Sequence, residues 1–211
     1  FERGVLGVAV EHVHRRACAA ADAADDAQGD LVRSARAVRR WRVHDLGCGT
    51  GAVGAAAALA LASVFGAQPS VHALDLSGWA LGEARATCRA FGLPHRERRG
   101  ALPGALPRAG RGDLLVLGFV VNELDAPART TLIDALDDRL AHGASLLLIE
   151  PLARGIAPWW NDAAAALAPR GVRMLETRRT VERPAWIERL DDASGLDHRE
   201  VGARALLHAG L

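Results

Sequence analysis

Short apolar runs alternate along the chain with longer segments of helical periodicity. From residue 42 this pattern predicts helices at 52–65, 78–91, 127–141 and 158–168, and strands at 42–46, 71–76, 95–99, 113–121 and 144–150. Continuous apolar strands that alternate with helices are typical of a parallel sheet covered on both faces. We therefore predict an α/β fold, a doubly wound and mostly parallel sheet with helices on both faces.

The two ends of the chain are less regular. The Ala-rich residues 1–41 are predicted to form an N-terminal helical segment, and the tail shows strand patterns at 172–178 and 201–208 around a helical piece at 184–193. No linker is long enough to divide the chain after residue 41. We therefore expect residues 42–211 to form a single domain.

Composition restricts the chemistry more than the fold. All 26 basic residues are arginine, so mechanisms that need a lysine, such as Schiff-base chemistry or a phosphate-loop nucleotidase, are excluded. The 25 acidic residues leave a net charge of +1, from which no strong preference for a polyanion follows. Cys18, Cys48 and Cys88 are too widely spaced for a CxxC pair. We interpret them as reduced thiols of a cytoplasmic protein without a metal site.

The stretch from Leu46 to Val71 carries no charge and is long enough to suggest a membrane span. It is dominated by Ala and Gly, however, and its flanks lack aromatic or basic anchors. We interpret it as a buried strand, turn and helix, and expect no membrane partner.

The segment VHDLGCGTG at 43–51 joins the first of these strands to the following helix. Glycines at such a turn let the backbone approach a ligand, and the helix N-terminus presents unpaired N–H groups to an anion. Gly47, Gly49 and Ala52 also satisfy a permissive dinucleotide-binding pattern, so the glycines alone leave a nicotinamide dehydrogenase open.

Two carboxylates argue against a nicotinamide dehydrogenase and for a different ligand. Asp45 lies two residues before the first glycine, where dehydrogenases usually carry an apolar residue and where a carboxylate can attract an ammonium group. Asp75 ends the second strand, where a carboxylate can accept both hydroxyls of a ribose. The pair suits a ligand with an amino-acid end and a nucleoside end, and S-adenosylmethionine has both.

At these residues the sequence resembles the class I S-adenosylmethionine-dependent methyltransferases, whose Rossmann-like fold agrees with the predicted sheet. The resemblance covers 42–151 and rests on the glycine motif at 45–51, the acidic strand end Asp75-Leu76-Ser77 and the fourth-strand motif at 113–123. It implies S-adenosylmethionine as cofactor, S-adenosylhomocysteine as product, and an N-terminal segment that can act as a lid.

The resemblance also implies roles for individual residues. The methionine end is assigned to Asp45 and the glycine turn, the ribose to Asp75, and the adenine side to Leu76. The full set of expected cofactor-binding residues is Asp45, Gly47, Cys48, Gly49, Gly51, Asp75, Leu76 and Val121. Relatives often carry an acidic residue after the third strand for the adenine amino group, whereas this chain has Arg99-Gly100-Ala101-Leu102 there.

Candidate residues for the acceptor lie at the carboxyl ends of the later strands. Asn122 and Glu123 are the expected catalytic residues, because polarity changes abruptly after the apolar strand and Glu123 can take a proton. Glu150, Trp159 and His14 are the expected substrate-binding residues. The alternative for Asn122 and Glu123 is helix capping, for which Asp125 is better placed.

Three functions remain open for the protein, two of which differ in the acceptor of the methyl group. Neutral charge and compact size favour transfer of a methyl group to a small molecule. A ribosome- or RNA-associated methyltransferase is supported by the Arg-rich segments 33–42 and 96–111. It is also supported by similarity to the methyltransferase-like family of the mitochondrial ribosomal small subunit, at Val121-Asn122-Glu123-Leu124, Ile149-Glu150-Pro151 and Arg183-Pro184-Ala185-Trp186. That family's later segment carries metal-binding cysteines, and none follows Cys88 here. The third function is a non-catalytic, cofactor-binding assembly or regulatory protein.

Overall fold

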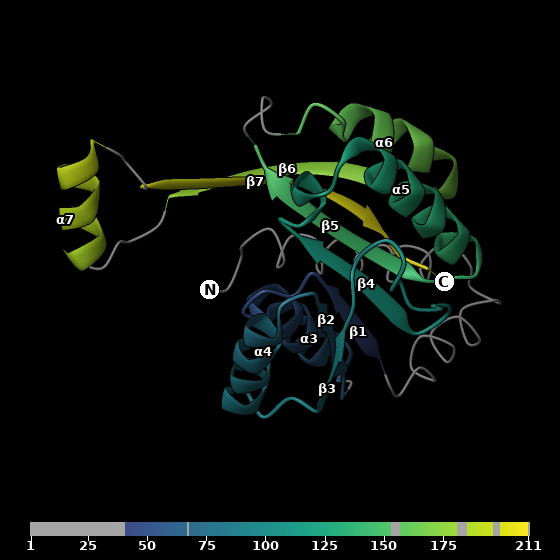
Figure 1. Ribbon diagram of the computed structural model, residues 1–211, viewed down its shortest axis with the longest axis horizontal. Helices are drawn as coiled ribbons and strands as arrows, with labels where there is room; N and C mark the ends of the chain where they lie inside the picture. The colour runs from purple at the N-terminus through teal and green to yellow at the C-terminus, as the bar shows by residue number, and fades with distance from the viewer. Residues whose placement is uncertain (1–40, 67, 153–156, 181–184, 196–198, 211) are drawn as a thin grey trace, which may run out of the picture.

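The computed structural model describes residues 41–210 except 67, 153–156, 181–184 and 196–198 (Figure 1). The N-terminal helical segment predicted at 1–41, and with it His14, lies outside the described residues apart from Trp41.

A seven-stranded sheet runs through the molecule in the order β3-β2-β1-β4-β5-β7-β6. The first five strands pair in parallel, while β7 runs antiparallel to both β5 and β6. The strands are β1 (Arg42–Leu46), β2 (Ser70–Asp75), β3 (His95–Arg99), β4 (Asp113–Gly118), β5 (Ser145–Pro151), β6 (Arg173–Thr180) and β7 (Glu200–His208). The mostly parallel α/β sheet predicted from the sequence is therefore confirmed.

Helices cover both faces of this sheet, with α3 and α4 on one side and α5 and α6 on the other (Figure 1). Their bounds are α3 (Ala52–Phe65), α4 (Gly78–Ala90), α5 (Ala126–Ala141) and α6 (Trp160–Leu167). The uncharged stretch at 46–71 forms the end of β1, the glycine turn, α3 and the start of β2. None of the helices among the described residues has the length and apolar character that a membrane span requires.

The buried strands explain why two helical layers are needed. Successive side chains of a strand point to opposite faces. In β4, Leu115 and Leu117 pack in the core that includes α5 and α6, while Leu114 and Val116 pack in the core that includes α3. A strand that is apolar at every position has to be covered on both sides.

The fourth strand ends earlier than predicted. The sequence pattern predicts a strand to residue 121, but β4 stops at Gly118 because Phe119 adopts a left-handed conformation with φ of 62°. A single turn of 3-10 helix, η1 (Val121–Glu123), follows. Asn122 and Glu123 therefore lie on this turn and not at the end of a strand. Asp125 caps α5, as expected, by accepting a hydrogen bond from the Ala128 N–H at 2.8 Å.

The connection from β3 to β4 contains no helix. Residues 100–112 form turns and irregular backbone, with Leu102 and Leu106 packed against the core beside α5. The Nε of Arg139 in α5 donates a hydrogen bond to the Pro107 carbonyl at 2.9 Å and holds the loop in place. The loop thus stands where a doubly wound fold usually places a covering helix.

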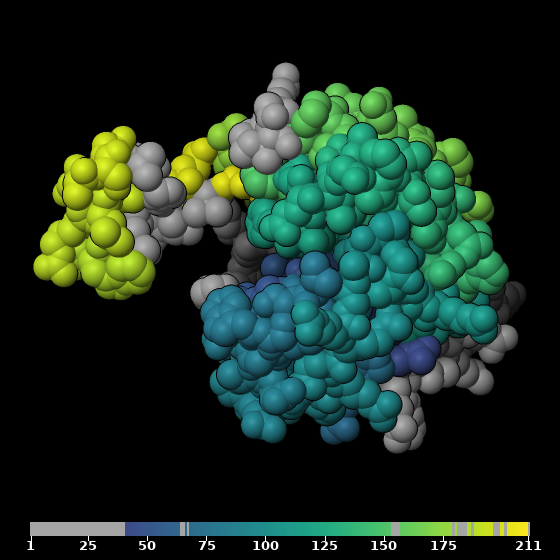
Figure 2. All heavy atoms as spheres, in the orientation of Figure 1, coloured from purple at the N-terminus to yellow at the C-terminus, as the bar shows by residue number. Residues whose placement is uncertain are grey.

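The last helix stands apart from the body of the molecule. Helix α7 (Ala185–Ser194) lies at the far end of the long β6–β7 pair, and Figure 2 shows it separated from the other elements. Trp186 and Leu190 on this helix are more than half exposed. The β6–β7 pair with α7 is called the arm below.

Candidate functional site

A cavity of about 720 Å³ opens at the carboxyl ends of β1, β2, β3 and β4. Strand β1 lies between β2 and β4, so the chain order reverses there, and ligands of open α/β sheets bind at this point. The described residues that line the cavity are Gly47, Cys48, Gly49, Thr50, Ala52, Val53, Asp75, Leu76, Gly100, Ala101, Leu102, Gly118, Phe119, Val120, Glu123 and Leu124.

The glycine turn forms one wall of this cavity. Gly47 has φ of 70°, and a Cβ there would lie 2.2 Å from Cγ2 of Val120, so the turn needs glycine both for its conformation and for packing. A Cβ on Gly49 would meet no atom within 4 Å. The space beside the Gly49 Cα is thus open, and a ligand in the cavity can approach the backbone closely there.

Asp75 ties the glycine turn to the entrance of α4. Its Oδ2 accepts a hydrogen bond from the Gly49 N–H at 3.0 Å, and its Oδ1 accepts one from the Ser77 N–H at 2.8 Å. A carboxylate has about four acceptor positions, so two remain for ligand hydroxyls. The neighbouring Leu76 is 64% exposed and offers an apolar surface to the same cavity.

Asp45 lies beneath the turn and does not line the cavity. Its side chain is buried, and Oδ2 accepts a hydrogen bond from the Gly54 N–H in the first turn of α3 at 3.2 Å. Burial raises the pKa of this carboxyl from 3.8 to about 7, against the lowering effect of the Gly54 hydrogen bond. Asp45 can therefore take or lose a proton near neutral pH.

Cys48 lines the cavity as a protonated thiol. Burial, together with the negative charges of Asp45 and Asp75, raises its pKa to about 12. Because the thiolate is the reactive form of cysteine, Cys48 is not suited to act as a nucleophile.

The N-terminus of α3 faces the cavity without a capping side chain. Its N-cap is Gly51, no side chain bonds to it, and its first turn contains no acidic residue. Ala52 and Val53 in this turn line the cavity. The first N–H groups of a helix have no partner within the helix, so this end can accept a carboxylate.

Of the two expected catalytic residues, Glu123 lines the cavity and Asn122 does not. The Nδ2 of Asn122 donates a hydrogen bond to Oε2 of Glu150, and its Oδ1 accepts one from Nε1 of Trp159 at 2.9 Å. Its amide thus has partners on both sides, while Glu123 is directed toward the site on the same turn.

Glu150 holds the η1 turn from below. It is fully buried, and its Oε1 accepts a hydrogen bond from the Val121 N–H at 3.1 Å. Burial raises its pKa to about 7, and this is opposed by hydrogen bonds from the 121–122 segment and by the positive charge of Arg204 on β7. Val121, Glu150 and Trp159 all lie outside the lining of the cavity, as part of the support of the turn that carries Glu123.

The charge in the cavity has one sign. Asp75 and Glu123 are carboxylates, and none of the described lining residues is basic. Such a cavity suits a cation or a ligand rich in hydroxyl groups better than a pyrophosphate. Within the described part of the chain, no group of three or more His, Cys, Asp or Glu is arranged to hold a metal ion.

Several lining residues were not among the sequence-based candidates. Phe119, Val120 and Leu102 are apolar, and in the sequence they cannot be distinguished from core residues. The only signal for them is their position directly after a predicted strand, at the edge where ligands bind.

Comparison with solved structures gives the same fold. The precorrin 8w decarboxylase of Methanobacterium thermoautotrophicum is 21% identical, with a TM-score of 0.52 over 82% of this chain and 83% of that one. The precorrin-6y C5,15-methyltransferase of Geobacter metallireducens is 15% identical, with a TM-score of 0.52 over 84% and 87%. A SAM-dependent methyltransferase from Aquifex aeolicus is 18% identical, with a TM-score of 0.48 over 80% and 82%. No family model and no curated protein matches the chain. The chain thus has the class I methyltransferase fold expected from the sequence.

Proposed function

We propose that this protein is an S-adenosylmethionine-dependent methyltransferase that acts on a small-molecule acceptor. The observation that carries the proposal is the open backbone at Gly49, set between a buried acid, Asp45, and a cavity-lining acid, Asp75, at the reversal point of the sheet. A solved structure with the same fold that is named as a methyltransferase, the one from Geobacter metallireducens, supports it.

The residues of the cavity fit the three polar parts of this cofactor. The N–H groups of Ala52 and Val53 suit the carboxylate of the methionine end. Asp45, buried behind the glycine turn, adds negative charge near the ammonium in its ionised form. The free acceptor positions of Asp75 suit the ribose hydroxyls. Leu76 and Leu102 provide apolar surface for the adenine.

When bound, S-adenosylmethionine supplies a methyl group already activated by the sulfonium. The chain then has to hold the acceptor in line with that methyl group and exclude water. Of the described residues that line the cavity, Asp75 and Glu123 are the two carboxylates, and Asp75 is assigned to the ribose. We assign Glu123 the positioning of the acceptor and, where the acceptor must lose a proton, the role of general base.

The location of the arginines favours a small acceptor over RNA. Arg42, Arg96 and Arg111 come from the two Arg-rich segments, and the structure brings them together at the amino ends of the strands. The cavity with the glycine turn lies at the opposite ends of the same strands and has no described basic residue. Arg99 and Arg129 lie at the edge of this cavity, but their guanidinium groups donate hydrogen bonds to the Leu76 and Leu124 carbonyls. Among the described residues, a polyanionic substrate would therefore find no lining cation beside Glu123.

Calorimetry with S-adenosylhomocysteine tests the cofactor assignment. We expect binding to the intact chain, weakened in Asp75→Asn by about 1–3 kcal/mol, because buried ribose hydroxyls lose a charged acceptor. Asp134→Asn, an exposed carboxylate on α5, is the matched control and should bind like the wild type. Absence of binding to the wild type, or equal affinity in a folded Asp75→Asn, would contradict the assignment.

Turnover separates the enzyme from a non-catalytic binding protein. Incubation with labelled S-adenosylmethionine and a panel of small acceptors should release S-adenosylhomocysteine in an acceptor-dependent manner. Binding without turnover for any small molecule, RNA or ribosomal subunit would favour the assembly or regulatory role.

A further inference from the structure

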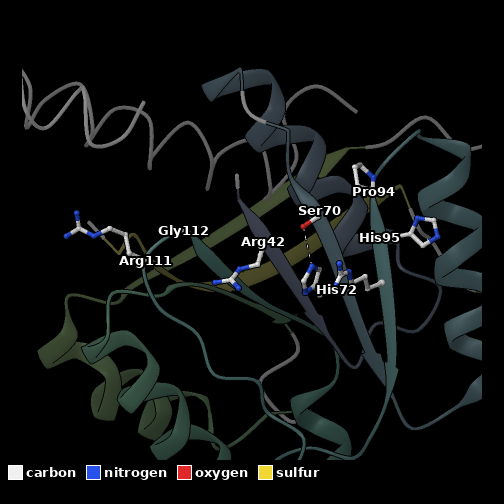
Figure 3. A pocket seen from close by; sticks show the side chains of 8 residues that line it. Arg42, Ser70, His72, Pro94, His95, Arg111 and Gly112 are labelled. Atoms are coloured by element: carbon white, nitrogen blue, oxygen red, sulfur yellow. Dashed lines mark hydrogen bonds between the residues drawn. The ribbon is translucent and has the colours of Figure 1, made fainter. Parts of the chain in front are cut away.

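The sheet carries a second cavity, of about 570 Å³, at the amino ends of β1, β2 and β3. Arg42, Ser70, His72 and Arg96 contribute from the strands, and Arg111 from the loop before β4. Figure 3 shows Arg42, Ser70 and His72 together in the centre of this basin, with Arg111 and His95 at its two sides.

This cavity exists because the β3–β4 connection is a loop. Arg42 is in register with Ser70, and His44 with His72, which is in turn in register with Arg96, so these side chains share one face of the sheet. The 100–112 loop packs over the carboxyl half of this face through residues such as Leu102 and Leu106. The amino half stays open, and a further cavity of about 310 Å³ continues along it from His72 and Arg96 to Leu74 and Pro107.

Positive charge dominates this basin. Its nearest buried carboxylate, Asp113, is already bound on both oxygens: Oδ1 lies 2.6 Å from Nε of Arg42 and 3.3 Å from Nε2 of His44, and Oδ2 accepts from the Gly110 N–H at 3.0 Å. Glu97 on β3, which lines the adjoining cavity, already pairs with Arg85 of α4 at 3.1 Å and lies 3.5 Å from Nε2 of His95. Within the described part of the chain, Arg96 and Arg111 form no ion pair, and both are exposed.

We propose that this basin binds a small ligand through a phosphate or diphosphate group. Guanidinium groups match the geometry of phosphate oxygens with paired N–H donors, and the Ser70 hydroxyl adds a donor beside them. The volume lies in the range of about 300–1,000 Å³ that small-ligand sites occupy. The adjoining cavity shares His72 and Arg96 with the basin and is also lined by Leu46 and Leu74. It gives room for the part of the ligand that carries no phosphate, if that part is apolar or planar.

His72 contributes as a neutral hydrogen-bonding group. Burial and the positive fields of His44, Arg96 and Arg42 lower its pKa below 6.5, and its Nε2 lies 3.3 Å from the Ser70 hydroxyl. Burial is the larger cause of this lowered pKa, and the positive charges of His44, Arg96 and Arg42 add to it. A polymeric anion fits less well, since the chain carries a net charge of only +1.

This site is independent of the proposed methyl transfer, because it uses the opposite ends of the strands. Titration of the full chain with pyrophosphate at low ionic strength, followed by calorimetry, tests it. We expect saturable binding of one pyrophosphate, weakened about tenfold or more in Arg96→Gln and in Arg111→Gln, since each removes a charged donor pair. Arg89→Gln, an exposed arginine near the end of α4, removes the same charge elsewhere and should leave the affinity unchanged.

Three results would overturn the proposal. The first is a wild type that does not bind pyrophosphate saturably. The second is an equal loss in Arg89→Gln and Arg96→Gln, which would show a general effect of charge. The third is competition by S-adenosylhomocysteine, which would place the anion in the other cavity. A short single-stranded RNA that binds through Arg96 where pyrophosphate does not would assign the basin to a nucleic acid instead. Thermal unfolding of each variant checks that the fold is kept.

Discussion

Asp45 is a buried acid that holds its proton up to about neutral pH. In the unfolded chain the same carboxyl loses its proton near its ordinary pKa of 3.8. Between these two values the folded state binds more protons than the unfolded state, so the free energy of unfolding falls as the pH rises and becomes level above about pH 7. Asp45 thus costs stability at the pH where it is ionised.

We predict that Asp45→Asn removes this dependence. Relative to the wild type, the variant should gain on the order of 2 kcal/mol in the free energy of unfolding between pH 5 and pH 8. Urea denaturation at several pH values measures it. Glu150, whose pKa is also raised, contributes equally to both proteins and cancels in the difference. A constant difference across this range would show that the pKa of Asp45 is not raised.

Asn122 holds Glu150 and Trp159 through its side-chain amide, whereas the Glu123 side chain forms no hydrogen bond or ion pair with any described residue. We predict that Glu123→Gln lowers turnover more than it lowers affinity for S-adenosylhomocysteine, because Gln keeps the size and loses the basic oxygen. The measurement is kcat against cofactor Kd with an acceptor found by the screen. Equal losses, or no loss in either quantity, would return Glu123 to a structural role.

At the scale of elements, the contact between α3 and β1 depends on one small residue. A Cβ on Gly54 would lie 2.4 Å from Oδ2 of Asp45, so the helix can approach the strand only with glycine there. Gly82, in the exposed part of α4, has no atom within 4 Å of the same position. Gly54 lies in the first turn of α3 and Gly82 in the second turn of α4, and the two positions differ in their surroundings.

We predict opposite effects of alanine at these two positions. Gly82→Ala should raise the free energy of unfolding by about 0.5–1 kcal/mol, the usual gain of alanine over glycine inside a helix. Gly54→Ala should lower it by about 1–3 kcal/mol, since the added methyl group displaces a buried, hydrogen-bonded carboxyl. Chemical denaturation compares them. A gain in both variants would show that α3 can move away from Asp45 at little cost.

Most helices and strands could be predicted from the sequence. Helices and strands from residue 42 to 208 follow from apolar periodicity and from turn glycines, because both signals are local. The early end of β4 could not be predicted, since Phe119 in a left-handed conformation has no local signal in its residue type.

The candidate site was predictable only in part for the same reason. The glycine turn, Asp75 and Glu123 lie where the motifs indicate, beside the cavity. The Asn122 amide bonds to both Glu150 and Trp159 and so joins three separate segments of the chain. Such contacts form only through tertiary packing and have no local signal in the sequence. Sequence alone therefore nominated these three residues for direct contact with ligands, and the structure places them behind the η1 turn.

At the scale of the whole molecule, one sheet supports two cavities of opposite charge. The carboxyl ends of β1 and β2 carry Asp45 and Asp75, and their amino ends carry Arg42 and Ser70. Each of these strands is only five or six residues long. The separation by ends explains how a chain with nearly balanced charge can present both a negative and a positive cavity.

Strand β7 of the arm has different pairing partners at its two ends. Residues 203–207 of β7 pair with β5 on one side and with β6 on the other, and His208 pairs with β5 alone, whereas residues 200–202 pair with β6 alone. Backbone amides exchange with solvent when their pairing opens, and the outer part can open without disturbing the body. A single continuous strand should then show two exchange lifetimes. Hydrogen–deuterium exchange is expected to be complete early at 200–202 and late at 203–207. One uniform rate along β7 would mean that the outer residues 200–202 and the inner residues 203–207 open together.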